Sequence, residues 1–504
     1  MRTFLLRYAF ICLGVLIVGL SLASPHRVYC GDQIPAGERT LPKAEDLLVQ
    51  SYEIGKSFST AERVYLLTEL NLAGAEIKFP KTEQWAQEEF NLTLELPHEW
   101  NRVASQKNAI EALSAFDPDR AMALMHRMDR TLPDEGGRLP VDLRAVCARV
   151  VFPNYWKAKG PNAFDRLRSE ARQLAVSGEY PYVAMADIIK SSALKPEQVS
   201  YLVGDAALAY QKGSPFESED RAYVYFLKAV QSKARADQFR RSLEYAVDHL
   251  IAKGNADKEK KFTLNTYTSN GTLTLTKMED ELLFELLPIA KQSDPDLAEK
   301  IVAARADFKK VEGADIKATE GAYGSTEGRA RALERSRVRE VAAISSKDPH
   351  QALTLAQSIN DPALQATALA YVAGGLQQTA PEQSAQILKT IKQNASSIGA
   401  GESKVRMFVA LTQTAAASKD VATFDFAFHD GLDLGTELFD EDAESHPAKP
   451  AYDTASFDEL SSLVAVGAGF QLQTTLQEVV DVRSDVLKAY LLIEIAKVAH
   501  QKPN

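Results

Sequence analysis

Apolar residues recur at helical spacing along most of the chain, from about Ala44 onward. The residues between them are mainly Ala, Glu, Lys, Gln and Arg, which have high intrinsic helix propensity. The pattern therefore predicts an all-α protein, with the exceptions described below.

A recurring Asp-Pro pair marks where several of the predicted helices begin. It occurs at Asp117-Pro118, Asp294-Pro295, Asp348-Pro349 and Asp361-Pro362. An Asp at the N-cap accepts a hydrogen bond from a free backbone N–H and complements the positive end of the helix dipole. A Pro at the first helical position loses no hydrogen bond, because that N–H has no partner within the helix. Each pair therefore predicts a helix start.

The sequence around two of these pairs also repeats. Residues 110–128 align without gaps to residues 341–359, with 6 of 19 positions identical and the apolar positions in the same phase. In each segment a helix, a short turn, Asp-Pro and a second helix follow one another. Pro349 and Pro381 are 32 residues apart, a spacing typical of two-helix repeats. We therefore predict helix-turn-helix repeats.

This pattern resembles the α-solenoid proteins of the tetratricopeptide and HEAT kind, and uncharacterised exported bacterial helical-repeat proteins. The resemblance covers residues 100–200 and 280–400. The Trp, Leu-Gly and Tyr set of tetratricopeptide repeats does not occur at the expected spacing, so the subfamily stays open. The resemblance implies stacked helical hairpins that offer an extended binding surface.

Two segments interrupt the helical pattern and divide it into blocks. Residues 262–276 alternate apolar and polar around Asn270-Gly271, which predicts a small β-hairpin. Residues 311–328 contain four glycines and no periodicity, which predicts a flexible linker. We therefore expect an N-terminal helical block over 45–310 and a C-terminal block over 329–504.

The first residues have the pattern of an export signal. Arg2 and Arg7 precede an apolar run, and Ser21 and Ala23 have the small side chains of a cleavage site. We predict a signal peptide over 1–23, a disordered spacer over 24–44, and a periplasmic or extracellular protein. The alternative is an uncleaved anchor, although the apolar run is shorter than the roughly 20 residues that span a bilayer comfortably.

The remaining chemistry of the sequence excludes several function classes. The formal net charge is −10, which argues against nucleic acid as a partner. The eight histidines show no zinc-site spacing, and no nucleophile elbow or phosphate-binding loop occurs. We therefore predict no catalytic, cofactor-binding or metal-binding residues and no cofactor. Whether Cys30 and Cys147 pair in an oxidising compartment stays open.

Three functions remain compatible with this sequence. We favour a non-catalytic scaffold for protein–protein interaction in the cell envelope, which requires an exposed groove. One alternative is a carbohydrate-active enzyme built on an α-helical toroid. It requires a deep pocket that holds two carboxyl groups with perturbed pKa values and nearby aromatic side chains. The other alternative is a structural component of envelope assembly.

Overall fold

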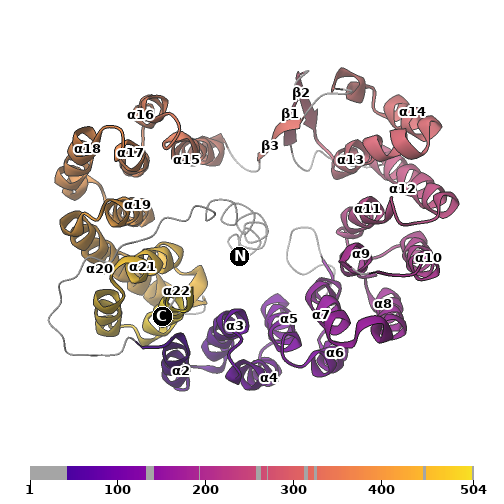
Figure 1. Ribbon diagram of the computed structural model, residues 1–504, viewed down its shortest axis with the longest axis horizontal. Helices are drawn as coiled ribbons and strands as arrows, with labels where there is room; N and C mark the ends of the chain where they lie inside the picture. Colours follow the sequence, from indigo (N-terminus) through magenta and orange to yellow (C-terminus); the bar gives the residue numbers. More distant parts are fainter. Residues whose placement is uncertain are drawn as a thin grey trace. The chain divides into compact units, whose positions relative to one another are not determined.

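The computed structural model shows an all-α protein with one small sheet (Figure 1). It describes residues 42–131, 141–191, 193–256, 263–268, 271–311, 316–322, 326–446 and 450–501. The predicted fold class, all-α helical repeats, is confirmed. The predicted signal segment 1–23 and nearly all of the predicted spacer 24–44 lie outside the described residues. No helix within the described ranges has the length and apolar character needed to cross a membrane.

The chain forms two compact units. One unit is Gly74–Ala330; the other combines the chain up to Ala73 with the chain from Arg331 onward. This division differs from the predicted blocks 45–310 and 329–504, because the first helices belong to the same unit as the last. The reason is a contact between α2 (Ala44–Gly55) and α22 (Asp485–Gln501): the buried Ser51 hydroxyl donates to the Ala489 carbonyl at 2.8 Å. Local periodicity carries no information on such a distant contact.

The unit Gly74–Ala330 stacks its helices in two layers. One layer runs α5, α7, α9, α11, α13, and consecutive members pack on one another. The other layer runs α8, α10, α12, α14, again in consecutive contact. We call these the odd and the even layer. The helices are α4 Lys81–Thr93, α5 Trp100–Ser114, α6 Pro118–Arg127, α7 Leu143–Lys159, η1 Gly160–Ala163, α8 Phe164–Ser177, α9 Tyr182–Ser191, α10 Pro196–Lys212, α11 Glu219–Val230, α12 Ala236–Ala256, α13 Met278–Ser293, α14 Pro295–Ala304 and η2 Ala306–Val311.

The other unit follows the same plan. Helices α17 and α19 pack together, α19 packs on α21, α21 on α22 and α22 on α2. Its remaining elements are α3 Thr60–Glu76, which crosses the boundary, α15 Thr326–Ile344, α16 Pro349–Gln357, α17 Pro362–Leu376, α18 Pro381–Asn394, η3 Ala395–Ser397, α19 Glu402–Ser418, α20 Val421–Ser445, η4 Ala451–Asp453 and α21 Phe457–Asp481.

The four Asp-Pro pairs begin helices as predicted. In each pair the carboxylate caps a backbone N–H: Asp117 caps Arg120, and Asp348 caps Gln351 at 2.9 Å. Asp361 accepts from two backbone N–H groups of α17, and Asp294 caps α14. These bonds satisfy donors that every helix start leaves free, and losing one costs roughly 0.5–2 kcal/mol.

Hydrogen bonds between neighbouring repeats show the true period. The Asn154 amide donates to Ser114 across 40 residues, and the Gln377 amide donates to the Thr414 carbonyl across 37. The equivalent starts of α17 and α19, Pro362 and Glu402, lie at similar spacing. The repeat is therefore longer than the 32 residues that separate Pro349 and Pro381, the starts of α16 and α18.

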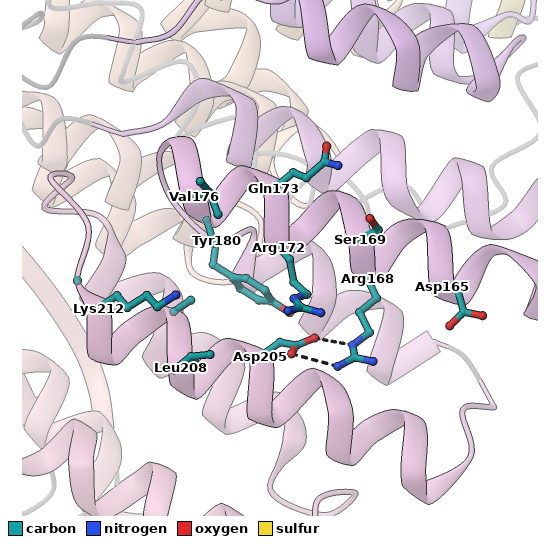
Figure 2. Close-up of a pocket in the computed structure, with 13 residues that line it drawn as sticks. Asp165, Arg168, Ser169, Arg172, Gln173, Val176, Tyr180, Asp205, Leu208 and Lys212 are labelled. Atoms are coloured by element: carbon teal, nitrogen blue, oxygen red, sulfur yellow. Dashed lines mark hydrogen bonds and ion pairs between the residues drawn. The ribbon is translucent and has the colours of Figure 1, made fainter.

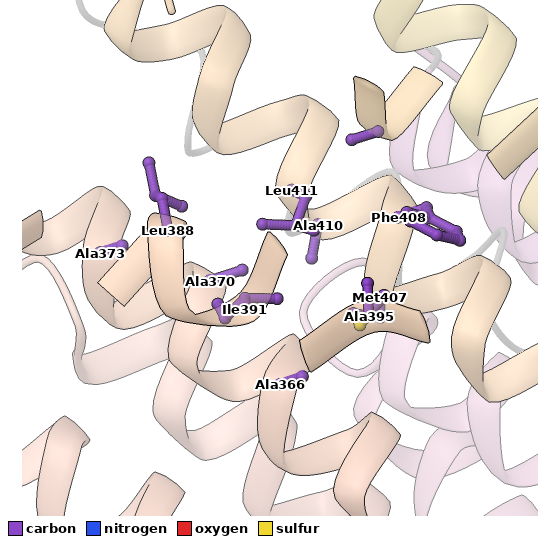
Figure 3. Close-up of a cluster of buried hydrophobic side chains, with 11 residues drawn as sticks. Ala366, Ala370, Ala373, Leu388, Ile391, Ala395, Met407, Phe408, Ala410 and Leu411 are labelled. Carbon is purple, nitrogen blue, oxygen red and sulfur yellow. The ribbon is translucent and has the colours of Figure 1, made fainter. Parts of the chain in front are cut away.

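Helix α17 shows how an odd-layer helix holds two neighbours together. Ala366, Ala370 and Ala373 face α18 and α19 in one buried cluster (Figure 3). Residues 364, 368, 372 and 376 face α15 and α16 in a second cluster. Since both faces are apolar, the helix is buried nearly all round, as expected for an element between two stacked repeats.

The sheet differs from the predicted hairpin. Strands β1 (Thr263–Thr268) and β2 (Gly271–Leu275) pair antiparallel within the predicted range 262–276, and β3 (Ile316–Ala322) pairs with the other edge of β1. The element is therefore a three-stranded sheet rather than a separate hairpin. The predicted flexible linker 311–328 supplies β3. An isolated hairpin is marginally stable, and a third strand pairs the backbone groups of its free edge.

Candidate binding groove between α8 and α10

A hollow in the unit Gly74–Ala330 lies between two consecutive even-layer helices, α8 and α10 (Figure 2). A glycine ends each of these two helices. Gly178 ends α8 where an added Cβ would lie 1.9 Å from a carboxylate oxygen of Asp142, so only glycine fits. Gly213 ends α10 at a φ of +73°, a conformation that L-residues with side chains rarely adopt.

The groove encloses about 730 Å³, within the range of small-ligand and peptide sites. Both helices supply its walls, and the segment after α8 supplies its floor. It is lined by Asp165, Arg168, Ser169, Arg172, Gln173, Ala175, Val176, Tyr180, Asp205, Leu208, Ala209, Lys212 and Gly213.

One ion pair crosses the groove. The Arg168 guanidinium donates to both carboxylate oxygens of Asp205, at 2.6 Å and 3.2 Å. This bond to Asp205 raises the pKa of Arg168. The guanidinium also lies 4.5 Å from the ring centre of Tyr201. A bidentate pair that also stacks on a ring has a fixed geometry, so it holds the two walls at a set separation.

Tyr180 forms the floor of the groove. Its side chain is 1% exposed, and its hydroxyl has no hydrogen-bond partner within the described chain. Burial and the charge of Asp205 raise its pKa, so the hydroxyl keeps its proton and acts as a donor. In Figure 2 the ring points into the space between the helices, beside Arg172. A buried donor without an acceptor costs free energy, so the site favours a ligand that accepts.

The exposed side chains of the groove include large apolar groups. Val176 is 86% exposed and Leu208 is 52% exposed. Tyr201, which stacks on Arg168, is 53% exposed. Single exposed apolar residues need no explanation, but several around one hollow are typical of an interaction site.

A cluster of buried carboxyl groups lies next to the groove, at the starts of α7, α9 and α11. The Glu179 backbone N–H donates to Asp142, and the Ser218 hydroxyl donates to the Glu179 carboxyl at 2.6 Å. The Tyr182 hydroxyl donates to Glu219 at 3.0 Å. Asp142 and Glu179 thus bond the repeat that follows, and Glu219 bonds the one that precedes, so the cluster joins consecutive repeats.

Burial shifts the pKa values of this cluster. Burial raises the pKa of Glu179 to about 8 and that of Glu219 to about 7. Burial also acts on Asp220, but hydrogen bonds from His249 and Lys253 outweigh it and lower the pKa to about 2. Protonated and ionised carboxyl groups therefore coexist here at neutral pH.

This cluster bears on the enzyme hypothesis. Glu179 and Glu219 combine raised pKa values with neighbouring tyrosines, which is one of the features that hypothesis requires. Neither residue lines the groove, and both carboxyl groups are engaged by hydroxyls of the protein. A general acid must reach its substrate, so the geometry gives these carboxyl groups a structural role between repeats.

The odd layer of this unit presents charges that are already paired. Asp187 accepts from the Tyr225 hydroxyl at 2.8 Å and pairs with Arg149 at 3.4 Å. Farther along, Arg221 pairs with Glu281, and Lys228 with Glu285 at 3.0 Å. These pairs connect α7 to α9 and α11 to α13, so they stabilise the stacking of repeats.

The remaining polar chemistry lies apart from the groove. Cys147 is buried in α7, where burial raises the pKa of its thiol. Cys30, whose pairing with Cys147 the sequence leaves open, lies outside the described residues. Within the described ranges, no three His, Cys, Asp or Glu side chains are grouped so as to hold a metal ion.

The sequence did not indicate the groove. Arg168, Arg172 and Lys212 look like ordinary solvated charges on helices, and Tyr180 looks like an ordinary core aromatic. The glycines after α8 and α10 are typical of helix ends, and neither distinguishes a groove from an ordinary turn. The groove exists because two helices of different repeats and a connecting segment meet, which no single window of sequence shows.

The comparisons with known proteins leave the family open. No family model matches the chain, and no curated protein matches it. A solved structure described as "Circular tandem repeat protein with novel repeat topology and enhanced subunit contact surfaces" is similar over 90% of this chain and 97% of its own, at 11% identity and a TM-score of 0.17. That TM-score is too low for the likeness to inform this protein.

Proposed function

We propose that this protein is an exported, non-catalytic scaffold that binds another protein through the groove between α8 and α10. The described residues form the helical-repeat architecture that such a scaffold requires. The N-terminal pattern of residues 1–23 supports export, to the periplasm or the cell exterior.

The observation that carries the binding role is the contrast between two surfaces of one unit. Charges on the odd layer pair with one another from helix to helix. The groove of the even layer instead combines exposed apolar side chains with an unpartnered buried hydroxyl among the described residues. Binding of a partner at the groove is favourable, because it buries the exposed apolar side chains and gives the buried hydroxyl an acceptor.

Site-specific photo-crosslinking in the source cells tests this proposal. A photoreactive amino acid is placed at Val176 or Leu208 in the groove, and at Val421 or Val480 as controls. The controls are also exposed apolar positions, at 48% and 44%, but lie in the other unit. The proposal expects a discrete protein adduct from the groove positions alone.

Two results would overturn it. An identical set of abundant proteins from all four positions would show that the groove has no partner of its own. Adducts from every position to one constant neighbour would instead favour a structural component of envelope assembly. Fractionation of the same cells tests export: recovery with the cytoplasm would contradict that part.

A further inference from the structure

The charges of the groove do not cancel. Arg168 and Asp205 neutralise each other, and Asp165 lies at the end of the groove away from Tyr180 (Figure 2). Arg172 and Lys212 also line the groove, and neither forms an ion pair with a described side chain. The part of the groove around Tyr180 is therefore positive, although the protein as a whole carries a net charge of −10.

The unpartnered hydroxyl lies in this positive part. Tyr180 points into the groove beside Arg172 (Figure 2), and the charges of Asp205, Arg168 and Arg172 all act on it. Arg168 neutralises Asp205, so Arg172 contributes the uncompensated charge next to the hydroxyl. A phenol donor beside a guanidinium, in a groove that Lys212 also lines, favours an acceptor that carries negative charge. A carboxylate offers two oxygens and about four lone-pair directions, so it has enough acceptor sites for three such donors.

The walls beside these donors are apolar. Val176 belongs to α8 and Leu208 to α10, and both are exposed by more than half of their surface. A free inorganic anion would use the donors and leave these side chains in water. A peptide that carries an acidic residue beside an apolar residue would cover both features.

We propose that the α8–α10 groove binds an acidic peptide segment of the partner protein. Its Asp or Glu carboxylate accepts from Arg172, Lys212 and Tyr180, and a neighbouring apolar side chain packs on Val176 and Leu208. This inference rests on the proposed scaffold function and specifies the chemistry of its partner.

A selection from a random displayed 12-residue peptide library tests it with the full-length protein. Parallel selections use wild type, the groove charge swap Arg172→Glu/Lys212→Glu, and the control swap Lys347→Glu/Lys389→Glu. The control changes the net charge equally at exposed lysines of the other unit. We expect peptides enriched by wild type and by the control to carry Asp or Glu beside an apolar residue. The groove swap should lose these peptides and enrich basic ones.

A second measurement separates the roles of charge and hydroxyl. The affinity of the strongest wild-type peptide is compared with that of its Glu→Gln or Asp→Asn version, and with its affinity for Tyr180→Phe. Removal of the peptide charge should weaken binding at least tenfold, and Tyr180→Phe should weaken it several-fold without unfolding the protein. Thermal melting of each variant checks the fold.

The outcomes distinguish the two proposals. Basic or uncharged peptides that bind the groove would overturn the acidic-peptide inference and leave the scaffold function intact. Equal enrichment on wild type and on the groove swap would show that acidic peptides bind elsewhere, which also overturns it. Binding of inorganic phosphate to the wild type but not to the groove swap, with no peptide enriched, would mark a small-anion site instead and contradict both proposals.

Discussion

At the scale of single residues, two tyrosines two positions apart have opposite hydrogen-bonding states. Both are buried, at 1% and 0% exposure. The Tyr182 hydroxyl donates to Glu219, whereas the Tyr180 hydroxyl has no partner among the described residues. Removal of a bonded hydroxyl leaves its acceptor unsatisfied, but removal of an unbonded one relieves a desolvation cost.

We therefore expect Tyr180→Phe to leave the free energy of unfolding unchanged or to raise it by up to about 1 kcal/mol. Tyr182→Phe should lower it by about 1–3 kcal/mol. Urea unfolding of both variants measures the difference. Equal destabilisation by the two changes would mean that the Tyr180 hydroxyl has a partner within the protein.

The buried glutamates predict how stability depends on pH. The pKa values of Glu179 and Glu219 are raised to about 8 and about 7, from 4.5 in the unfolded chain. Each group is protonated in the folded protein over a pH range where the unfolded chain has released its proton. Its contribution to stability is therefore complete below about pH 4.5 and is lost as pH rises through the folded pKa values of about 7 and 8.

In this range the free energy of unfolding should fall by about 1.4 kcal/mol per pH unit for each group. Glu179→Gln/Glu219→Gln keeps the hydrogen-bond acceptors and removes both titrations, so the double variant should show a much flatter profile between pH 5 and pH 8. Urea midpoints over this range provide the measurement. Parallel profiles for wild type and variant would show that these carboxyl groups are already ionised in the folded protein.

At the scale of elements, helix starts were the part of the fold that the sequence predicted best. Asp117, Asp294, Asp348 and Asp361 each combine a strong cap with proline, so local physics alone decides the structure there. The β3 strand was missed for the opposite reason. The glycines of residues 311–328 indicate a loop, and only pairing with β1, about 50 residues earlier along the chain, makes part of that segment extended.

Neighbouring glycines inside α17 provide a test of helix packing. An added Cβ at Gly375 would lie 2.0 Å from the Ser345 carbonyl oxygen at the end of α15. At Gly374 the nearest atom would be 3.6 Å away, an ordinary contact with Thr414. Glycine in a helix interior lowers stability by roughly 0.5–1 kcal/mol relative to alanine. At position 375 the close approach of the α15 backbone leaves no room for a Cβ, which accounts for the glycine there.

Gly374→Ala should therefore leave stability unchanged or raise it by up to about 1 kcal/mol. Gly375→Ala should lower it by about 1–3 kcal/mol, because α15 and α17 must move apart. Thermal or urea unfolding of the two variants compares them directly. If both substitutions stabilise the protein, α17 does not approach α15 as closely as described.

At the scale of the whole molecule, the first described helix belongs with the last. Leu48 of α2 is fully buried, and the Ser51 hydroxyl donates to the backbone of α22. The sequence predicted two helical blocks in chain order. It could not show that one unit takes its helices from both ends, because residues 51 and 489 are 438 positions apart.

Leu48→Ala should lower the free energy of unfolding by about 2–5 kcal/mol. Hydrogen exchange should then accelerate in residues 485–501 as well as in 44–55. Leu208→Ala is the control, since that side chain is 52% exposed and should leave both segments unchanged. Faster exchange restricted to residues 44–55 would contradict the packing of α2 on α22.

The groove is a property of the assembled repeats and could not be predicted from the sequence. Its donors come from α8, from α10 and from the segment between α8 and α9.

Photo-crosslinking in the source cells tests most directly whether the partner protein binds at the groove. The photo-crosslinker is placed at Leu208, in wild type and in Arg172→Glu/Lys212→Glu, and adduct yield is compared at equal protein levels. The account predicts a discrete adduct that is lost in the charge swap. An adduct of unchanged identity and yield in the charge swap would contradict it.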